Sequence, residues 1–580
     1  MSAEKLITDH IDIWTSAIKA KSASGRGSSK KRELYGIKKL RELILELAVR
    51  GKLVPQDPNY EPASVLLERI ASERARLAVE GKIKKSKIFS PVTEQEQAFD
   101  IPSSWRWLKL GSIGYDHGQK KPDCSFTYID VGAINKEMGL IESADILEAE
   151  AAPSRARKLV KEGTVIYSTI RPYLLNIAVV DRTIFPEPIA STAFAIIHPF
   201  EGILSSFVYR YLRSPSFVSY VESVQTGVAY PAINDKQFFS GVIPIPPTEE
   251  QHRIVAKVDE LMALCDQLEQ QTEASLDAHQ VLVETLLATL TNSQDATELM
   301  ANWARISEHF DTLFTTEQSI DQLKQTILQL AVMGKLVPQD PNDEPAAKLL
   351  ERIAEEKAQL VKEKKIKKQK ALPPIAEDEK PFELPKGWEW IRLGALTSLV
   401  TSGSRGWNKY YSDSGATFIR SQDIKYDRVE FDNRAFVELP QSTEGKRTKV
   451  DLGDILVTIT GANVGKAAVV EQELPEAYVS QHVSLIKLMD QRLSPYIHLW
   501  LTGSHGGRLH LLSQSYGDKP GLNLQNINEL IVPVAPEEHQ LLVLTKVDQL
   551  MELCERLKQR LCDSQQTQLQ LTDAIVGEAL

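Results

Sequence analysis

The sequence predicts an α+β protein in which two globular domains, mostly β or mixed α+β, are separated by long antiparallel coiled-coil helices and related by a pseudo-two-fold internal repeat. Three observations lead to this prediction. A phrase occurs twice with one change, as "LAVRGKLVPQDPN" from Leu47 and as "LAVMGKLVPQDPN" from Leu330. Long apolar stripes of helical spacing flank the repeats. Two dissimilar segments rich in short β-type runs lie between them.

The repeat defines a duplicated frame. Residues 47–87 align with residues 330–370 at a constant offset, and most of these positions are identical. The similarity extends to "SWRWLKLG" and "GWEWIRLG", almost vanishes, and returns at Pro231 and Pro520. Within the returning segment, "VAPEEHQ" departs from the pattern of the first copy at one position. We align His539 with Gln251 there and interpret the difference as a tolerated substitution.

The frame segments have the spacing of paired helices. Before each domain, apolar residues step by three and four positions, and Gly51 and Gly334 end the stripe. A second helix is expected from Pro62 and from Pro345. After each domain the spacing returns, and a helix over residues 252–290 would be about 55–60 Å long at 1.5 Å per residue. The four stripes are Ile37, Leu40, Ile44 and Leu47; Ile320, Leu323, Ile327 and Leu330; Ile254, Val258, Leu261, Cys265 and Leu268; and Val543, Val547, Leu550, Cys554 and Leu557.

The segments between the frames read as strands. Runs such as "FTYIDVGAI" and "GDILVTITG" are short, rich in β-branched residues, and separated by Gly, Asn, Asp and Pro. We therefore divide the chain into an N-terminal helical region (1–103), domain 1 (104–246), a central helical region (247–386), domain 2 (387–535) and a C-terminal helix (536–580).

Composition narrows the class of protein. The formal net charge of −10 argues against a generally basic nucleic-acid coat, although it leaves local DNA contacts open. We find neither a signal peptide nor an apolar run long enough to span a bilayer, and expect a cytoplasmic protein. Four cysteines form no disulfide or metal-binding pattern, and Cys265 and Cys554 are expected to be buried in helices.

Catalytic motifs are not found. "TGANVGKA" has one residue too few between its glycines for a phosphate-binding loop and lacks the following Ser or Thr, so we predict a strand, a turn and a second strand. The Asn-Pro-Pro-aromatic tetrapeptide of adenine methyltransferases is absent as well. His482 is more typical of a surface or strand histidine than of a ligand. We expect no catalytic residue and no metal ligand in this chain.

Residues suited to DNA do occur in both domains. Arg matches guanine and Asn or Gln matches adenine in the major groove, while Ser and Lys suit phosphates. The candidates in domain 1 are Gln119, Lys120, Lys121, Arg171, Tyr173, Asn176, Thr226, Tyr230 and Asn234. The candidates in domain 2 are Ser402, Ser404, Arg405, Trp407, Asn408, Lys409, Arg420, Gln422, Asn463, Lys466, Tyr516 and Asn523.

Several motifs together resemble a known family. Each domain is followed by a proline-rich strand and a long helix, in "IPIPPTEEQHRIVAKVDEL" and "IVPVAPEEHQLLVLTKVDQL". This layout resembles the specificity subunits of type I restriction-modification enzymes. "GDILVTITGANVGKAAVV" and "YVSQHVSL" are similar to the target recognition domains of that family, and the repeated "GKLVPQDP" resembles its branch of longer subunits.

The resemblance implies a division of labour. Each recognition domain would read one half of an asymmetric, bipartite target in double-stranded DNA, and the paired helices would fix the unread spacer. Half-sites one helical turn apart, roughly 34 Å, would present their grooves on one face of DNA. Two modification subunits, which bind S-adenosylmethionine and methylate adenine at N6, and two restriction subunits, which use ATP and magnesium, would carry the chemistry. The chain itself would hold no cofactor.

Two other functions remain open from the residues. The chain could be a pseudo-symmetric coiled-coil adaptor whose domains bind proteins without reading DNA, and the near-neutral charge of the domains keeps this alternative open. It could also be a complete restriction and methylation enzyme, against which the absent methyltransferase motif counts.

Overall fold

The computed structural model describes residues 3–20, 32–83, 89–425, 428–439, 445–503, 506–515 and 521–580. The chain forms two compact units, unit 1 (Met1–Ser275 and Ser564–Leu580) and unit 2 (Leu276–Asp563). Unit 1 contains the predicted domain 1 and unit 2 contains the predicted domain 2. The division into five regions at the residues given above stays a prediction.

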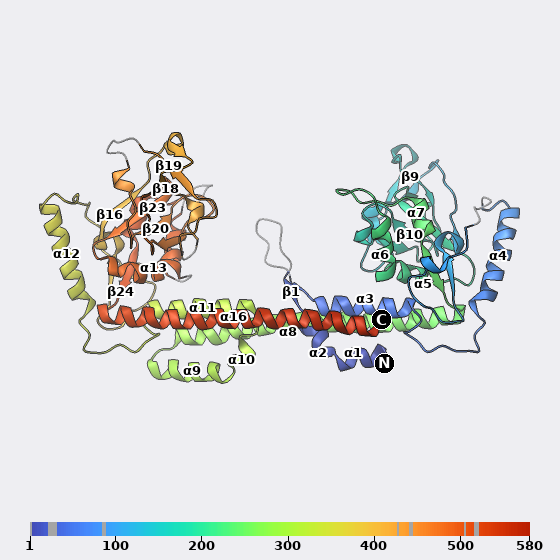
Figure 1. Cartoon of the computed structure of the whole chain (residues 1–580), viewed down its shortest axis with the longest axis horizontal. Helices are drawn as coiled ribbons and strands as arrows, with labels where there is room; N and C mark the ends of the chain where they lie inside the picture. Colours follow the sequence, from blue (N-terminus) through green and yellow to red (C-terminus); the bar gives the residue numbers. More distant parts are fainter. Residues whose placement is uncertain are drawn as a thin grey trace. The chain divides into compact units, whose positions relative to one another are not determined.

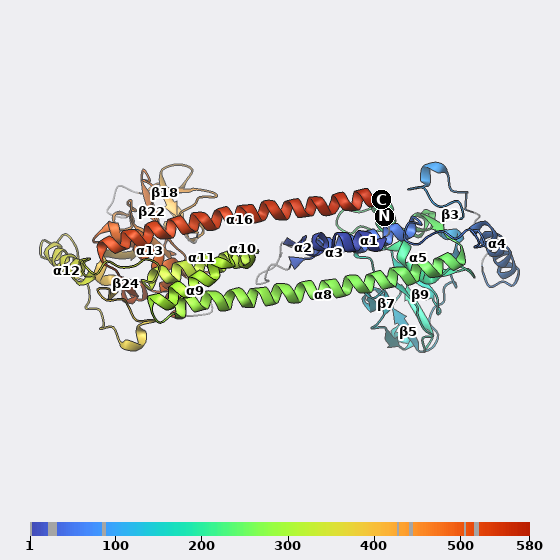
Figure 2. The same ribbon diagram turned by 90° about the horizontal axis from the view of Figure 1, so that it is seen from below.

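Unit 1 is built on a bundle of three helices. Helix α3 (Tyr35–Val49) lies between the first part of α8 (Thr248–Asn292) and the last part of α16 (Glu537–Ala579), as Figure 2 shows. Arg41 of α3 forms ion pairs of 2.6 Å with Asp266 and Glu269 of α8. The hydroxyl of Tyr35 donates a hydrogen bond of 2.7 Å to Asp573 of α16. Both long helices therefore contact the short one directly.

Unit 2 contains an equivalent bundle, in which the last part of α8 and the first part of α16 flank a short helix. Helix α11 (Glu317–Val332) contacts the last part of α8 and the first part of α16 (Figure 1). Lys324 pairs with Glu555, at the positions that Arg41 and Asp266 occupy in the first frame. The register of the two frames is thus the same. Because α8 passes from unit 1 to unit 2 and α16 passes back, the two long helices run in opposite directions, as predicted.

The predicted apolar stripes are buried. All four residues of the α3 stripe and all four of the α11 stripe are at most 6% exposed, and so are most residues of the α8 and α16 stripes. Cys265 and Cys554 are buried among them, as predicted. Burial of a repeated a/d pattern at about 25 cal/mol per Å² of apolar surface is what holds each bundle together.

The repeated glycines end α3 and α11 for a steric reason. Gly51 and Gly334 have φ of 71° and 70°, a left-handed conformation that other residues adopt only at a cost. The backbone N–H of the following lysine then bonds back to the helix, from Lys52 to Leu47 and from Lys335 to Leu330, at 2.9 Å in both copies. The helices predicted to follow are present as α4 (Ala63–Val79) and α12 (Ala346–Lys362).

The lysines of the repeated phrase also bind the ends of the long helices. Lys335 Nζ donates to the carbonyl oxygens of Thr291 and Ser293, both at 2.9 Å, where α8 ends. Lys52 Nζ donates to the main-chain O atom of Leu580 at 2.7 Å, just after α16. A cation near the last carbonyls of a helix is favourable because it satisfies them and matches the helix dipole. In each copy, the lysine of the repeated phrase therefore contacts the end of one long helix.

One alignment made from the sequence was wrong. Gln251 donates through Nε2 to the carbonyl five residues earlier at 3.1 Å, and Gln540 does the same at 2.7 Å. Gln540 is therefore the counterpart of Gln251, and His539 stands opposite Glu250. The buried Glu250 accepts a hydrogen bond of 3.0 Å from Trp105 Nε1. The substitution thus changes the partner of a buried tryptophan and leaves the glutamine in place.

Domain 1 contains two small four-stranded sheets. Their strand orders are β11-β10-β13-β4 and β8-β5-β12-β9, and only the β5–β12 pair is parallel. The strands are β4 (Gly114–Tyr115), β5 (Phe126–Ile129), β8 (Asp145–Leu147), β9 (Ala156–Leu159), β10 (Val165–Ser168), β11 (Ile177–Val179), β12 (Pro188–Ser191) and β13 (Phe194–Pro199). The pair β3 (Arg106–Lys109) with β14 (Val242–Ile245), the pair β6 (Ile134–Asn135) with β7 (Leu140–Ile141), and helices α5 (Ser205–Leu212), α6 (Pro215–Val224) and α7 (Asp235–Ser240) complete the domain.

Domain 2 repeats the order of the first sheet, whereas its second sheet has the parallel pair at an edge and gains β17 on the other edge. Its sheets have the orders β16-β23-β20-β21 and β17-β19-β18-β22, again with one parallel pair, β18–β22. The strands are β16 (Thr397–Ser402), β17 (Tyr411–Ser412), β18 (Ala416–Ile419), β19 (Ala435–Val437), β20 (Ile455–Thr458), β21 (Ala467–Val469), β22 (Ala477–Val479) and β23 (Val483–Leu488). The pair β15 (Glu389–Arg392) with β24 (Ile531–Val534), and helices α13 (Ser494–Thr502), α14 (Gly507–Ser513) and α15 (Leu524–Glu529), match those of domain 1. The strand-turn-strand predicted for "TGANVGKA" is the β20–β21 hairpin.

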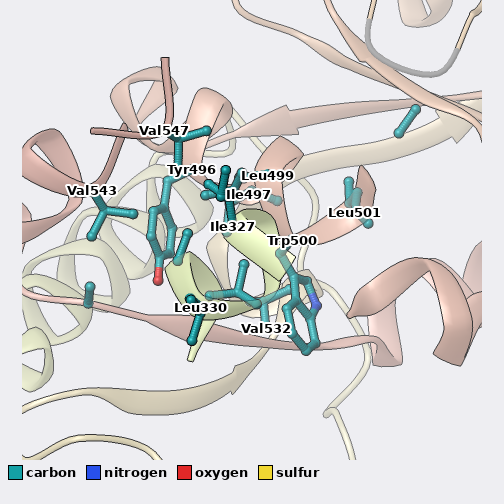
Figure 3. Packing of buried hydrophobic residues seen from close by; sticks show 14 of the residues in the cluster. Ile327, Leu330, Tyr496, Ile497, Leu499, Trp500, Leu501, Val532, Val543 and Val547 are labelled. Carbon is teal, nitrogen blue, oxygen red and sulfur yellow. The ribbon is translucent and has the colours of Figure 1, made fainter. Parts of the chain in front are cut away.

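A continuous apolar core fixes domain 2 on its frame. Figure 3 shows Tyr496 and Trp500 of α13 among residues of α11, α16 and β24. Trp500 Nε1 donates to the carbonyl oxygen of Ile531 at 2.9 Å, so the buried indole is satisfied. The labelled residues from the frame and β24 are Ile327, Leu330, Val532, Val543 and Val547, each at most 6% exposed. The domain is therefore held rigidly against its own bundle.

Four short helices precede the frames, α1 (Ala3–Asp9) and α2 (Ile11–Ser16) before α3, and α9 (Ala296–Glu308) and α10 (Phe310–Leu313) before α11. The small strands β1 (Lys19–Ala20) and β2 (Arg32–Glu33) pair with each other. Over the described ranges, none of the helices has the length and apolarity that crossing a membrane requires. The predicted α+β fold with two domains, long antiparallel helices and an internal repeat is confirmed.

Candidate nucleic-acid interface

Two loops of domain 1 meet and bring several predicted DNA-binding residues together. The loop after β10 and the loop between α6 and α7 are joined by hydrogen bonds from Arg171 N to Pro231 O and from Ile233 N to Thr169 O, at 2.8 and 2.9 Å. The guanidinium of Arg171 lies 4.8 Å from the centre of the Tyr230 ring. The residues gathered here from the predicted set are Arg171, Tyr173, Asn176, Thr226 and Tyr230.

The first of these loops holds an unusual backbone. Arg171 and Leu175 have φ of 48° and 53°, on either side of a single 3-10 turn over Pro172–Leu174. In the described part of the chain, only one further residue other than glycine, Lys364, has a positive φ. Such conformations cost of order 1–3 kcal/mol each and cluster at functional sites. The turn fixes Tyr173 in an exposed position, with 48% of its surface accessible.

The segment 119–121 pairs with β9. Gln119 is bridged to Lys158, and Lys121 is exposed. Lys120 is held between Asp123 and Glu187, at 2.8 and 2.9 Å, and these hydrogen bonds raise the pKa of Lys120. Because two carboxylates already balance its charge, Lys120 is less suited to a phosphate than the sequence alone indicated.

Two predicted readers cap helices. Asn234 Oδ1 accepts the N–H of Gln237 at the start of α7, and Asn523 Oδ1 accepts the N–H of Asn526 at the start of α15, each at 2.9 Å. Both belong to capping boxes, since the side chain three residues later returns a bond to the backbone of the asparagine. Asn234 and Asn523 occupy equivalent places in the two domains, and their side-chain oxygens are used within the fold.

Loops at the same position in domain 2 gather a different set of residues. A bridge between Thr460 and Gly521 matches the bridge between Ile170 and Ala232 in domain 1. Asn463 Nδ2 donates to the carbonyl oxygen of Ser421 at 3.4 Å, which brings the loop carrying Gln422 beside the loop carrying Asn463 and Lys466. This cluster is polar and carries amide groups that suit adenine.

The loop that carries Ser402, Ser404 and Arg405 lies against the turn between β22 and β23. Gly403 N donates to Ser480 O at 3.2 Å. A Cβ atom at Gly403 would lie 2.1 Å from a carbonyl oxygen of β22, so only glycine allows this approach. Arg405 is exposed beside this turn.

Other predicted residues of domain 2 have structural partners. Trp407 is 2% exposed and stacks on Phe418, with ring centres 5.7 Å apart. Arg420 makes two hydrogen bonds of 3.0 Å to the buried carboxylate of Asp423. Lys409 Nζ lies 4.7 Å from the centre of the Tyr410 ring. The side chain of Asn408 and the whole of Tyr516 lie outside the described residues.

The structure also brings polar side chains beside these loops that the sequence did not single out as DNA ligands. His482 Nδ1 shares a hydrogen bond of 2.5 Å with Thr460 Oγ1, and its Nε2 lies 3.1 Å from Gln481 Nε2. Gln481 and His482 are exposed in the turn between β22 and β23, and Thr460 follows β20. The sequence pattern that could have indicated Gln481 and His482 is their position between two short β-type runs in "YVSQHVSL". No group of three or more His, Cys, Asp or Glu able to hold a metal ion occurs in the ranges that the structure describes.

Comparison with known proteins identifies the family. Residues 117–278 match the family model described as "Type I restriction modification DNA specificity domain". The chain is 42% identical to the EcoAI specificity subunit and 43% identical to the EcoEI specificity subunit, both type I restriction enzyme subunits of Escherichia coli, and each alignment covers all of both chains.

A solved structure of a type I R-M system contains a chain of similar fold. It has a TM-score of 0.50 and 22% sequence identity, over 83% of this chain and 98% of that chain. The two full-length relatives and the shared fold lead to one conclusion. The chain belongs to the family of type I restriction-modification specificity subunits.

Proposed function

We propose that this chain reads a bipartite target in double-stranded DNA, with domain 1 on one half and domain 2 on the other. The observation that carries the proposal is the presence of unlike loop clusters at equivalent places on a duplicated frame. Equal frames place the two domains in equivalent settings, while the loops present Arg171 and two tyrosines in one domain and Arg405, Gln422 and Asn463 in the other. Unlike readers on like frames give a target whose halves differ.

The exposed side chains have the chemistry of base recognition. An arginine can donate two hydrogen bonds to O6 and N7 of guanine, and Asn or Gln can bond N6 and N7 of adenine. In domain 2, Arg405 and Gln422 are exposed, whereas Arg420 is engaged by Asp423. We therefore assign base contacts in domain 2 to the first two residues and to Asn463, and a structural role to Arg420.

The frame has the roles of spacer and dock in this proposal. Helices α8 and α16 are single helices of 45 and 43 residues, each of which belongs to both units. A helix of this length spans about 65 Å at 1.5 Å per residue, longer than one turn of DNA. Two modification subunits, with S-adenosylmethionine, and two restriction subunits, with ATP and magnesium, would assemble on it. Catalysis would lie in these partners.

Mapping of methylated adenines tests the proposal. Cells expressing the chain with its modification subunit should carry N6-methyladenine at a split, asymmetric target. Exchange of residues 104–246 for the same domain of a relative should change one half of that target and leave the other half unchanged. A change in both halves would contradict separate reading. Assembly with the partner subunits but no sequence-specific methylation would instead support a protein-binding adaptor.

A further inference from the structure

The two loops that meet in domain 1 expose an apolar surface. Five large apolar side chains are accessible there, Ile170 (36%), Tyr173 (48%), Leu174 (37%), Val228 (102%) and Tyr230 (69%). We call this group the apolar ridge. Isolated exposed apolar residues are ordinary, but a group of them on loops that the backbone holds together indicates a binding surface.

The ridge is held in place by the backbone on both sides. Thr226 and Ala232 exchange two hydrogen bonds of 2.9 Å, which closes the loop that carries Val228 and Tyr230. Gly227 supports this loop with a φ of 92°. The opposite loop is fixed by the left-handed residues on each side of its 3-10 turn. The ridge is therefore formed before any partner binds.

One cation contacts the ridge, and two more are exposed on segments that are linked to its loops through the backbone. The guanidinium of Arg171 packs on the Tyr230 ring within it. Thr169, next to Ile170 of the ridge, donates its backbone N–H to Ala193 O at 2.8 Å. The residue before Ala193, Thr192, donates its backbone N–H to Arg155 O at 2.8 Å. The exposed Arg155 is thus linked to the ridge loop through two backbone hydrogen bonds. Lys236 is exposed at the start of α7. An apolar surface in contact with a cation fits a polyanion that also presents apolar groups.

The neighbouring acid does not offset these cations. Asp235, beside Lys236, is paired with Lys158 at 3.1 Å. In the major groove of DNA, the apolar group displayed on the base edges is the C5-methyl of thymine. The ridge therefore has a partner of matching chemistry in a DNA groove, with phosphates nearby for Arg155 and Lys236.

The described loop of domain 2 that corresponds to the loop after β10 has a different chemistry. This loop is bridged to Gly521 and carries Thr460, Asn463 and Lys466 in place of Ile170 and the exposed side chains that follow it. The two domains thus differ in the kind of base contact that their equivalent loops can make. This contrast supplies a control within the molecule.

We propose that the apolar ridge of domain 1 reads its half of the target through thymine methyl groups, while domain 2 reads its half through polar contacts. The inference rests on the proposed function and adds the chemical group that is recognised. Burial of one methyl-sized group gives about a fourfold change in binding, so each methyl contacted should carry an effect of that size.

Removal of the methyl groups tests the inference. The full chain, in complex with its modification subunit, is titrated with the mapped target and with duplexes in which all thymines of one half are replaced by uracil. Uracil in the half read by domain 1 should weaken binding about fourfold for each methyl contacted. Uracil in the half read by domain 2 should leave the dissociation constant unchanged.

A variant connects the effect to the ridge. Val228→Ser removes an apolar side chain that is fully exposed, so the fold does not depend on it. This variant should bind the unmodified target about fourfold more weakly and should lose part of the response to uracil. Met138→Ser, at an exposed methionine on the β6–β7 turn, is the matched control and should respond as the unaltered chain does.

The outcomes separate the inference from the function on which it rests. Equal effects of uracil in both halves, or no effect in either, would overturn the inference. Specific binding to the unmodified target in the same experiment would still support the proposed function. Loss of the modification subunit from the Val228→Ser complex, with an unchanged uracil response, would also overturn the inference and mark the ridge as a protein contact. Failure of the unmodified target to bind specifically would overturn both.

Discussion

The single change in the repeated phrase, from Arg50 to Met333, predicts a measurable coupling. Arg50 Nε bonds to Glu46 at 2.9 Å, and the side chain of Glu46 is only 2% exposed. Glu46 also accepts hydrogen bonds from Ser216 N and Oγ. In the second frame the same two positions hold Gln329 and Met333, so acid and base are replaced together. Arg50→Met alone leaves a buried carboxylate without its cation.

The expected destabilisation follows from that burial. Loss of one member of a buried ion pair costs about 3–5 kcal/mol, and the remaining bonds from Ser216 place this case at about 3 kcal/mol. At about 2.1 cal/mol/K of unfolding entropy per residue, that corresponds to a fall of roughly 5 °C in the unfolding midpoint of a unit of this size. The double variant Glu46→Gln with Arg50→Met copies the second frame and should fall by only about 1 kcal/mol.

Thermal and urea unfolding of the full chain measure both variants. Both of them lose the bond from Arg50 to Leu580 O and the stacking of Arg50 on Phe99, so the difference between them isolates the unpaired charge. Recovery of most of the lost stability in the double variant is the expected result. A single variant as stable as the double, or a double no better than the single, would refute the reasoning.

Three further predictions follow from particular side chains. Lys364 has a φ of 58° at the position where the first copy has Gly81. Lys364→Gly should therefore stabilise the chain by about 0.5–1 kcal/mol, and Gly81→Lys should destabilise it by a similar amount. Urea unfolding would measure both changes. Trp407→Ala should cost about 3–5 kcal/mol of unfolding free energy, whereas Arg405→Ala should leave stability unchanged and relax one base preference by about 1–3 kcal/mol in binding assays. Burial lowers the pKa of His117 to about 4, below its ordinary value, so the stability present above about pH 6.5 should be lost as the pH falls toward 4. In His117→Gln, the free energy of unfolding should fall by about 1–2 kcal/mol less over this pH range than in the unaltered chain. This value allows for solvent screening of a half-buried ring, and unfolding measured across the range would test it.

The frame could be predicted from the sequence because its signals are periodic and local. The stripes before and after each domain predicted buried helix faces, and the repeated glycines predicted where α3 and α11 end. These features depend on neighbours three or four residues apart, which a sequence displays directly. The hairpin around Gly461 was found in the same way, from two short runs and the turn residues between them.

The candidate site was harder because side-chain partners come from distant segments. Trp407 stood in a loop rich in Ser, Gly and Lys, and nothing local indicated that Phe418 would cover it. Arg420 and Asp423 are close in sequence, but whether such a pair faces solvent depends on burial. The left-handed backbone at Arg171 has no sequence signal, since arginine rarely adopts it.

Some signals were present and were not used. Asn234 is followed three residues later by Gln237, and a capping box could have been recognised from this spacing. Glu46 and Arg50 change together to Gln329 and Met333, which indicates a pair at helical spacing. Residues that are identical in the two copies indicate the shared helical frame, and residues that differ together indicate side chains in contact.

The central claim is that the two domains are separate readers mounted on equivalent frames. Its most direct test replaces residues 104–246 with a second copy of residues 387–535 and maps N6-methyladenine in cells that also express the modification subunit. Because α8 and α16 run in opposite directions, the account predicts a target that is an inverted repeat of the half now read by domain 2. Methylation of the original asymmetric target, or of a site with unlike halves, would contradict it.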